Sequence, residues 1–334
     1  MHVSLRLALV LVALLAAAPR ASAAPTNTLR IAVLWPKGSK WMNDAQAGAR
    51  ELGRKTGGRV QVRFVEQPRL GEGAEACDGG MLAGPELAHY APDSLVYMLP
   101  LLFGTLEEAA AVRAAVDPQL AESLRGRGLV VLGVEDAGFG YVLSRTPVDT
   151  VNQFKQTRLW MPATEPEMVR MARAYGASPV PLEAGQVRSA LASNTVDAVI
   201  NSPVGAILLQ WHTQVSYVAD RPLLYLFVVT VLRQEALDRL APGDRDLVRE
   251  ALGRLFADAF RQTRQKEAEA LDVLARNGVE RRPLGADDAA RREWDAWAAS
   301  VADRLVADGL LSSGIVATVR AKLSELRAAG APHP

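Results

Sequence analysis

The chain has 334 residues, of which 49% are hydrophobic, and its 38 Lys and Arg residues nearly balance its 37 Asp and Glu residues. The charge balance argues against a nucleic-acid-binding surface or a polybasic membrane patch, and the apolar fraction argues against a disordered chain. The length accommodates one large domain or two of ordinary size.

The first 24 residues are a predicted signal peptide. Arg6 precedes the apolar run Leu7–Ala18, and the small-residue pattern Ala21-Ser22-Ala23 follows it. This order is typical of a cleavable export signal, and the run is shorter than the ~20 apolar residues of a membrane span. The single cysteine, Cys77, excludes an internal disulfide. We therefore expect a protein exported to a bacterial periplasm, with a core that needs no disulfide.

The mature chain opens with a β-α-β pattern. Leu29–Trp35 and Arg59–Val65 are predicted strands, and the segment between them has apolar residues at helical spacing up to Gly57-Gly58, which end the helix. Strands alternating with helices in this way favour an α/β domain.

Two capping boxes predict helix starts further along. Thr105 is followed three residues later by Glu108, and Thr164 is followed by Glu167. We expect the second of these helices to run to about Tyr175.

Four further strands are predicted at Gly128–Asp136, Thr157–Pro162, Val196–Pro203 and within Pro222–Leu232. A long amphipathic helix begins at Pro242, and the chain after about Ala241 is mostly helical. The pattern predicts a two-lobed α/β protein with a ligand cleft.

Few residues suggest enzymatic chemistry. The mature chain before its tail has two histidines, His89 and His212, without metal-ligand spacing, and no nucleophile elbow of the G-x-S-x-G type occurs. We therefore predict no catalytic residues, no metal site and no cofactor.

An aromatic set stands near predicted strand ends or in loops, where an open α/β sheet faces its ligand crevice. Core packing is the alternative for each residue taken singly. The set consists of Trp35, Trp41, Tyr90, Phe139, Tyr141, Trp160 and Trp211. By contrast, Trp294 and Trp297 lie at i, i+3 on a late helix and are predicted to be packing residues.

The mature chain resembles the extracytoplasmic solute-binding proteins of tripartite ATP-independent periplasmic (TRAP) transporters, of the dicarboxylate-binding type. The ordered segments that carry the resemblance are "GSKWMNDAQAGARELGRKTGGRVQVRF", "LPLLFGTLEEAAAV", "GLVVLGVEDAGFGYVLSRTPV", "YGASPVPLEAGQVRSALASNTVDAVINSP" and "LLQWHTQVSYVAD".

The resemblance implies two α/β lobes joined by crossing strands and a long connecting helix, with a helical C-terminal region. The boundaries we expect are 25–137 plus 226–265 for lobe I, and 138–225 plus 266–330 for lobe II. It also implies no enzymatic activity, and delivery of a small molecule to the small and large membrane subunits of a permease.

Two positions depart from the family pattern. Relatives that bind acids carry an arginine that clamps the ligand carboxylate, and the matching position here is Trp160. A second arginine of the family is replaced by Gly140. Arg158 lies two residues before Trp160 and is a non-standard candidate cation. A carboxylate buried without a partner is costly, so short dicarboxylates are poor candidate ligands.

The segments "LWMP" and "LLQWHT" resemble the branch of the family that works with a tetratricopeptide-repeat helper protein and is associated with hydrophobic ligands. In this interpretation Trp160 and Trp211 are walls of an apolar pocket, and Asn201 and Ser202 supply polar contacts. The expected ligand is an apolar or amphipathic small molecule.

The segment Arg69–Tyr90 is about ten residues shorter than the usual layout of such units. This motivates an alternative function, a non-transporting interaction or sensor protein on the same fold. Binding of an organic acid through Arg158 is a further alternative.

Overall fold

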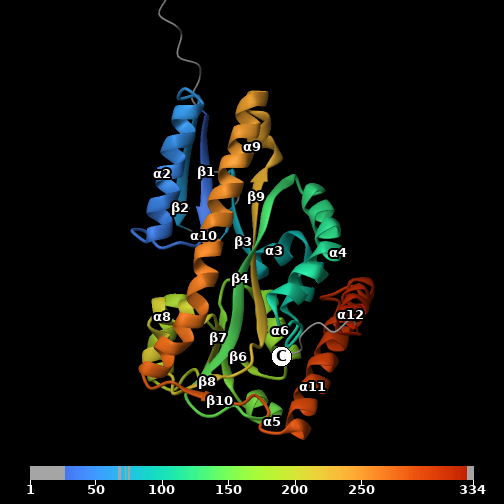
Figure 1. The fold of residues 1–334 in the computed structure, drawn as a ribbon. Helices are drawn as coiled ribbons and strands as arrows, with labels where there is room; N and C mark the ends of the chain where they lie inside the picture. Colours follow the sequence, from blue (N-terminus) through green and yellow to red (C-terminus); the bar gives the residue numbers. More distant parts are fainter. Residues whose placement is uncertain (1–26, 67–68, 72, 74–75, 329–334) are drawn as a thin grey trace, which may run out of the picture.

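The structure is a computed structural model that describes residues 27–66, 69–71, 73 and 76–328. The predicted signal peptide lies outside these residues. Figure 1 shows two α/β lobes, with helix α10 (Pro242–Arg276) running beside both of them. At 35 residues, α10 has a length of about 52 Å at 1.5 Å per residue.

The first lobe is built on five strands in the order β2-β1-β3-β9-β4. β1 pairs in parallel with β2 and β3, whereas β9 is antiparallel to both β3 and β4. A late segment of the chain is therefore inserted between two early ones. The strands are β1 Asn27–Val33, β2 Val60–Glu66, β3 Gly79–Ala83, β4 Leu129–Ser144 and β9 Leu224–Arg233.

Strand β4 belongs to both lobes. Its residues from Leu129 to Gly140 pair with β9, and those from Tyr141 to Ser144 pair with β7. The predicted strand Gly128–Asp136 is therefore too short. The alternation of apolar residues stops at Asp136 because the strand bulges between Asp136 and Gly138, where Gly138 has a φ of +89°.

The second lobe continues the sheet in the order β4-β7-β5-β6, and β8 pairs with β4 and β10. β5 is parallel to β6 and β7, as in a βαβ arrangement. Its strands are β5 Arg158–Pro162, β6 Ser178–Leu182, β7 Ala198–Asn201, β8 Tyr217–Ala219 and β10 Glu280–Arg282.

The helix starts of the first lobe follow the sequence signals. The Thr105 hydroxyl accepts a hydrogen bond from the Glu108 N–H at 3.1 Å, which confirms the predicted N-cap. The Glu108 carboxylate accepts from the N–H of Gly104, the residue before the N-cap, at 2.8 Å. Gly57 and Gly58 have positive φ after α2, as predicted. The helices are α2 Lys40–Lys55, α3 Gly84–Tyr90, η2 Pro92–Met98, α4 Leu106–Arg125 and α9 Gln234–Asp238.

The second capping box is wrong. The N-cap of α6 is Glu165, and the Thr164 hydroxyl lies 3.4 Å from the Glu165 carboxylate instead of capping the first turn. Pro166 restricts the residue before it to extended backbone, which fixes the helix start one residue later than predicted. The helices of this lobe are α5 Val151–Lys155, α6 Pro166–Ala174, η3 Ala184–Gln186, α7 Val187–Ala192, α8 Pro203–Leu208 and η4 Trp211–Thr213.

The C-terminal region is helical, as predicted. Helix α11 (Asp288–Ala307) packs against α5 and α6, whereas α12 (Ser313–Ala328) packs against α4 and η2 of the first lobe. The chain therefore returns to the first lobe after completing the second (Figure 1). Trp294 and Trp297 on α11 are buried, which confirms their predicted packing role.

The two-lobed fold with crossing strands β4 and β9 and a long helix is confirmed by this arrangement. Apolar residues of α10, among them Val248, Leu252 and Phe256, pack with β1 and α2. Further along, Leu274 packs with the second lobe around β7 and α7. The residue boundaries given above for the two lobes stay a prediction.

Candidate ligand-binding site

The described part of the chain contains a cavity of about 360 Å³ at the junction of the lobes. Its lining comes from the segment after β2, from α3, and from the start of α6. These are the carboxyl ends of strands, where ligands of open α/β sheets bind. The lining residues are Arg69, Gly71, Glu86, His89, Tyr90, Glu165, Pro166 and Glu167.

Arg69 connects the lobes across this cavity. Its Nη2 lies 3.1 Å from Oε1 of Glu165 in the second lobe, and its Nε lies 3.7 Å from Oε2 of Glu86 in the first. The Arg69 side chain is 47% exposed, whereas the two carboxylates are almost fully buried. The bridge holds α3 and the start of α6 at a fixed separation in this arrangement.

Burial dominates the electrostatics of both carboxylates. Desolvation raises the pKa of Glu86, while the Leu70 N–H and the Arg69 guanidinium oppose the rise. Desolvation likewise raises the pKa of Glu165, and Arg69 is the main opposing group. The cavity therefore presents one guanidinium that is already paired and a surplus of carboxyl groups.

Tyr90 is the predicted site residue that lines this cavity. Its ring makes an edge contact with His89, with ring centroids 5.1 Å apart. Both residues lie at the end of α3, so one end of that helix supplies an aromatic wall beside the Arg69 bridge.

Four other predicted residues gather where β4 meets β7. Tyr141 stands opposite Asn201 in the strand pair, and Phe139 contacts Tyr225 with ring centroids 6.1 Å apart. The polar groups of Asn201 and Ser202 are engaged locally. The Asn201 Oδ1 accepts from the Ser202 N–H at 2.8 Å, and the Ser202 hydroxyl caps α8 by accepting from the Gly205 N–H at 3.0 Å.

Trp160 and Trp211 pack on each other. Their ring centroids are 4.9 Å apart in an edge contact, and the Trp160 indole N–H donates to the Leu182 carbonyl at 2.9 Å. Trp211 is 1% exposed and lies in the core of the second lobe, while Trp160 is partly buried against it. In this arrangement Trp211 is a packing residue of the second-lobe core, and Trp160 packs against its ring.

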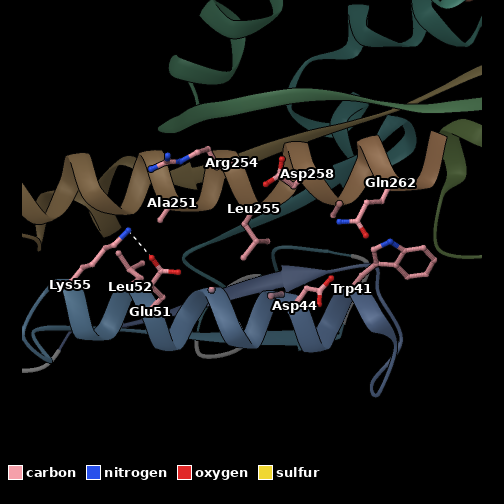
Figure 2. A pocket seen from close by; sticks show the side chains of 13 residues that line it. Trp41, Asp44, Glu51, Leu52, Lys55, Ala251, Arg254, Leu255, Asp258 and Gln262 are labelled. Carbon is pink, nitrogen blue, oxygen red and sulfur yellow. Dashed lines mark ion pairs between the residues drawn. The ribbon is translucent and has the colours of Figure 1, made fainter. Parts of the chain in front are cut away.

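The two tryptophans of the first lobe lie away from the junction cavity. Trp35 is 7% exposed and packs on Phe256 with ring centroids 5.6 Å apart. Trp41 lines a separate groove of about 410 Å³ between α2 and α10. Figure 2 shows Trp41 beside Gln262 at one end of this groove, with Leu255 pointing from α10 toward α2.

Arg158 lies at the far end of β5 from the junction cavity. It makes a bidentate pair with Asp197, at 2.8 and 2.6 Å, and is about half exposed. The guanidinium is therefore occupied, and the Asp197 pKa is lowered chiefly by this hydrogen bonding.

Sequence reasoning did not single out Arg69, Glu86 or Glu165 as site residues. They are far apart in the sequence, and no motif connects them. One local signal could have pointed to the two glutamates. Glu86 and Glu165 each stand next to a proline at the start of a helix that follows a strand.

Metal-site geometry and membrane-spanning helices are both absent from the described residues. No three His, Cys, Asp or Glu side chains come together as a metal site would require. None of the helices there is long and apolar enough to cross a membrane.

A family model described as DctP, bacterial extracellular solute-binding protein, family 7, matches residues 31–307. A solute-binding protein of Verminephrobacter eiseniae is 25% identical over 278 residues, which cover 78% of each chain.

Two solved structures have a similar fold. The first is DctP7, a Bordetella pertussis extracytoplasmic solute receptor binding pyroglutamic acid. It is 20% identical with a TM-score of 0.75, covering 89% of this chain and 99% of that one. The second is a TRAP periplasmic solute-binding protein from Ralstonia eutropha H16 with bound (S)-2-acetolactate. It is 16% identical with a TM-score of 0.77, covering 90% of this chain and 99% of that one.

Proposed function

The chain belongs to the DctP family, the bacterial extracellular solute-binding proteins of family 7, and from this premise we propose that it is the periplasmic binding component of a TRAP transporter. It captures a small molecule between its lobes and delivers it to the small and large membrane subunits. The family is one of solute-binding proteins and not of enzymes. In this proposal the predicted signal peptide exports the protein to the periplasm.

The proposed ligand is an apolar or amphipathic molecule. The observation that carries this proposal is that arginines around the cleft are either replaced or already paired with carboxylates. Trp160 and Gly140 stand where the family resemblance expects arginines, and Arg69 at the junction is already paired with Glu86 and Glu165. The two solved relatives named above hold organic acids, and a carboxylate needs a cation when it is buried.

The carboxyl-rich lining also constrains the polar end of the ligand. Glu86, Glu165 and Glu167 line the cavity together with the guanidinium of Arg69. Hydrogen-bond donors or a positive charge on the ligand complement this lining, whereas a second carboxylate is repelled. Tyr90 supplies an aromatic face for the apolar part.

The test combines native mass spectrometry of protein purified without refolding with a thermal-shift screen. We expect a co-purified mass, or stabilisation by amphipathic compounds in preference to short dicarboxylates. Tyr90→Ala is expected to reduce the ligand-induced shift, whereas Trp41→Ala, in the separate groove between α2 and α10, leaves it unchanged.

Two results would count against this proposal. Stabilisation only by short dicarboxylates, lost in Arg158→Ala and kept in the exposed-site control Arg188→Ala, would favour acid binding through Arg158. Complete absence of ligand from native protein and from screens with cell extracts would favour the alternative, an interaction or sensor protein.

A tetratricopeptide-repeat helper protein is the second proposed partner. The segment containing Leu208 and Leu209 resembles the branch that uses such a helper, and these two side chains are 56% and 43% exposed at the end of α8. We expect Leu208→Ser with Leu209→Ser to weaken binding of a purified helper protein, measured by calorimetry, without changing the thermal midpoint of the free protein.

A further inference from the structure

The point where the chain crosses between lobes contains a buried carboxyl group. Glu267 lies in the second half of α10 and packs against the bulge of β4. A Cβ atom at Gly138 would lie 3.3 Å from the Glu267 Cγ, so the missing side chain there makes room for the carboxylate. Gly138 is also the bulge residue with φ of +89°, next to the position where β4 passes from one sheet to the other.

The Glu267 carboxyl is shielded from water in this arrangement. Both oxygens are buried, and neither has a hydrogen-bond partner of acceptable geometry among the described residues. Burial raises the pKa of Glu267 to about 7, against a smaller opposing effect of the Ser202 hydroxyl and the Val204 N–H. These two donors at the start of α8 are therefore close to the carboxyl but poorly aligned with it.

The elements around α10 do not supply a compensating charge. From β4, Glu135, Asp136 and Tyr141 are the titratable groups, and Asp136 pairs with Arg113 and with Arg264. Helix α8, with the sequence Pro203–Leu208, has no titratable residue.

The charged residues of β10 and α2 interact with groups other than Glu267. Burial raises the pKa of Tyr141 and the positive charge of Arg281, on β10, opposes this rise, while the Arg281 guanidinium donates to the Asp220 carbonyl at 3.3 Å. From α2, Lys40 pairs with Asp44 and bonds Gln262. Burial sets the raised pKa of Glu267, and its two neighbouring donors oppose the rise.

We propose that Glu267 is a proton-sensitive latch at the lobe crossover, where a neutral carboxyl favours the lobe arrangement described above and a carboxylate favours one that exposes the group to water. The physical reason is that an ionised carboxyl is unfavourable when it is buried and has no well-aligned donor. A change of lobe angle must pass through the β4 bulge, because β4 is part of both sheets. Ionisation and lobe angle are therefore linked at this residue.

The sign of the effect follows from the direction of the shift. The group holds its proton more tightly in the packed arrangement than in one where it reaches water. Acidification therefore increases the population of the packed arrangement, and raising the pH through about 7 decreases it. This inference does not depend on the identity of the solute, and its test uses ligand-free protein.

The test measures the distance between fluorophores on the two lobes by time-resolved energy transfer. Arg54→Cys on α2 and Arg188→Cys on α7 are exposed positions, and the native Cys77 is buried. We expect the inter-lobe distance to change with a midpoint near pH 7, and Glu267→Gln to abolish the step. The matched control is Glu269→Gln, an exposed glutamate on the same helix, which keeps the step.

An infrared titration of the unlabelled protein provides a second readout. A protonated carboxylic acid band is expected below pH 7 in the native protein, well above the ordinary titration range of glutamate, and lost in Glu267→Gln. A distance step that persists in Glu267→Gln, no step in the native protein, or the absence of the acid band would each overturn the proposal. If Glu267→Gln fails to fold, the infrared titration of the native protein alone decides.

Discussion

Arg69 determines the electrostatics of the lobe junction because it is the guanidinium facing Glu86 and Glu165 across the cavity. A half-exposed ion pair contributes little to stability by itself. Its larger effect is on the ionisation of two buried carboxyl groups whose pKa values are already raised by desolvation.

Arg69→Gln is therefore expected to have a pH-dependent effect on stability. Because the folded-state pKa values of Glu86 and Glu165 are raised, the stability contributed by their protonated forms is present at low pH and is lost as the pH rises. Removing Arg69 raises both values further. We expect a loss of about 0.5–1 kcal/mol in unfolding free energy at neutral pH and a smaller loss near pH 4, measured by urea denaturation.

The control for this comparison is Arg50→Gln on α2, an exposed arginine away from the junction. It is expected to change the unfolding free energy by less than about 0.5 kcal/mol at either pH. An equal loss for Arg69→Gln at both pH values would contradict the role given to the two carboxyl groups.

Trp211 and Trp41, two tryptophans of the predicted aromatic set, differ in burial. Trp211→Ala removes a fully buried ring from the core of the second lobe and is expected to cost about 3–5 kcal/mol. Trp41→Ala, at a partly buried position in the groove between α2 and α10, is expected to cost about 1 kcal/mol. Urea unfolding measures both, and similar losses in the two variants would show that Trp211 is not a packing residue.

At the scale of secondary structure, the sequence predicts elements whose signals are local. The N-cap at Thr105, the glycines after α2 and the apolar face of α10 depend on neighbours a few residues away, and all three occur in the structure. The start of α6 was misplaced because Pro166 overrides the Thr164 signal. The predicted strand ends at Asp136, short of the full length of β4, because the chain bulges between Asp136 and Gly138 and its last four residues pair with β7 of the other lobe.

The junction cavity could be predicted only in part for the same reason. Tyr90 has a recognisable signal, an aromatic residue in a loop or near a strand end. The Arg69–Glu165 contact joins residues 96 positions apart and depends on how the lobes meet. Periodicity and spacing contain no information about how the two lobes contact each other. A family resemblance predicts such contacts only where the residues that make them are the same in both proteins.

Helix α4 is attached to the two crossing strands by a partly buried ionic network. Arg113 on α4 contacts Asp117 of the same helix, Asp136 of β4 and the Tyr225 hydroxyl of β9. Its side chain is 12% exposed. Removing one partner of such a network leaves the others buried without compensation.

Arg113→Leu is accordingly expected to lower the unfolding free energy by about 3 kcal/mol, measured by chemical denaturation. Arg125→Leu, at the exposed end of the same helix, pairs with Glu122 and is expected to change it by less than about 0.5 kcal/mol. A loss in Arg113→Leu no larger than that of Arg125→Leu would show that the network contributes nothing beyond its surface counterpart.

At the scale of the whole molecule, the C-terminal helix pair forms a further connection between the lobes. Helix α11 packs on the second lobe, while α12 packs on α4. The Arg327 side chain donates to the Glu108 carboxylate at 2.9 Å, and that carboxylate is almost fully buried. α12 therefore adds to the links made by β4, β9 and α10.

Arg327→Leu is expected to loosen this connection. The change removes a charge-assisted hydrogen bond to a buried carboxylate and is expected to cost about 2 kcal/mol. Amide hydrogen exchange in α12 should increase before exchange in α4. Lys322→Gln is the control, because Lys322 pairs with Glu325 within α12 itself, and faster exchange in both variants alike would argue against the connection to α4.

The place of β9 in the first sheet has a consequence for how the protein matures. β9 fills the gap between β3 and β4, but it begins at Leu224, long after β3 has ended at Ala83. A chain threaded through a membrane from its N-terminus must therefore hold β3 and β4 with open edges until the residues of β9 arrive. Assembly of the first lobe has to wait for most of the second to be delivered, so the two lobes mature together.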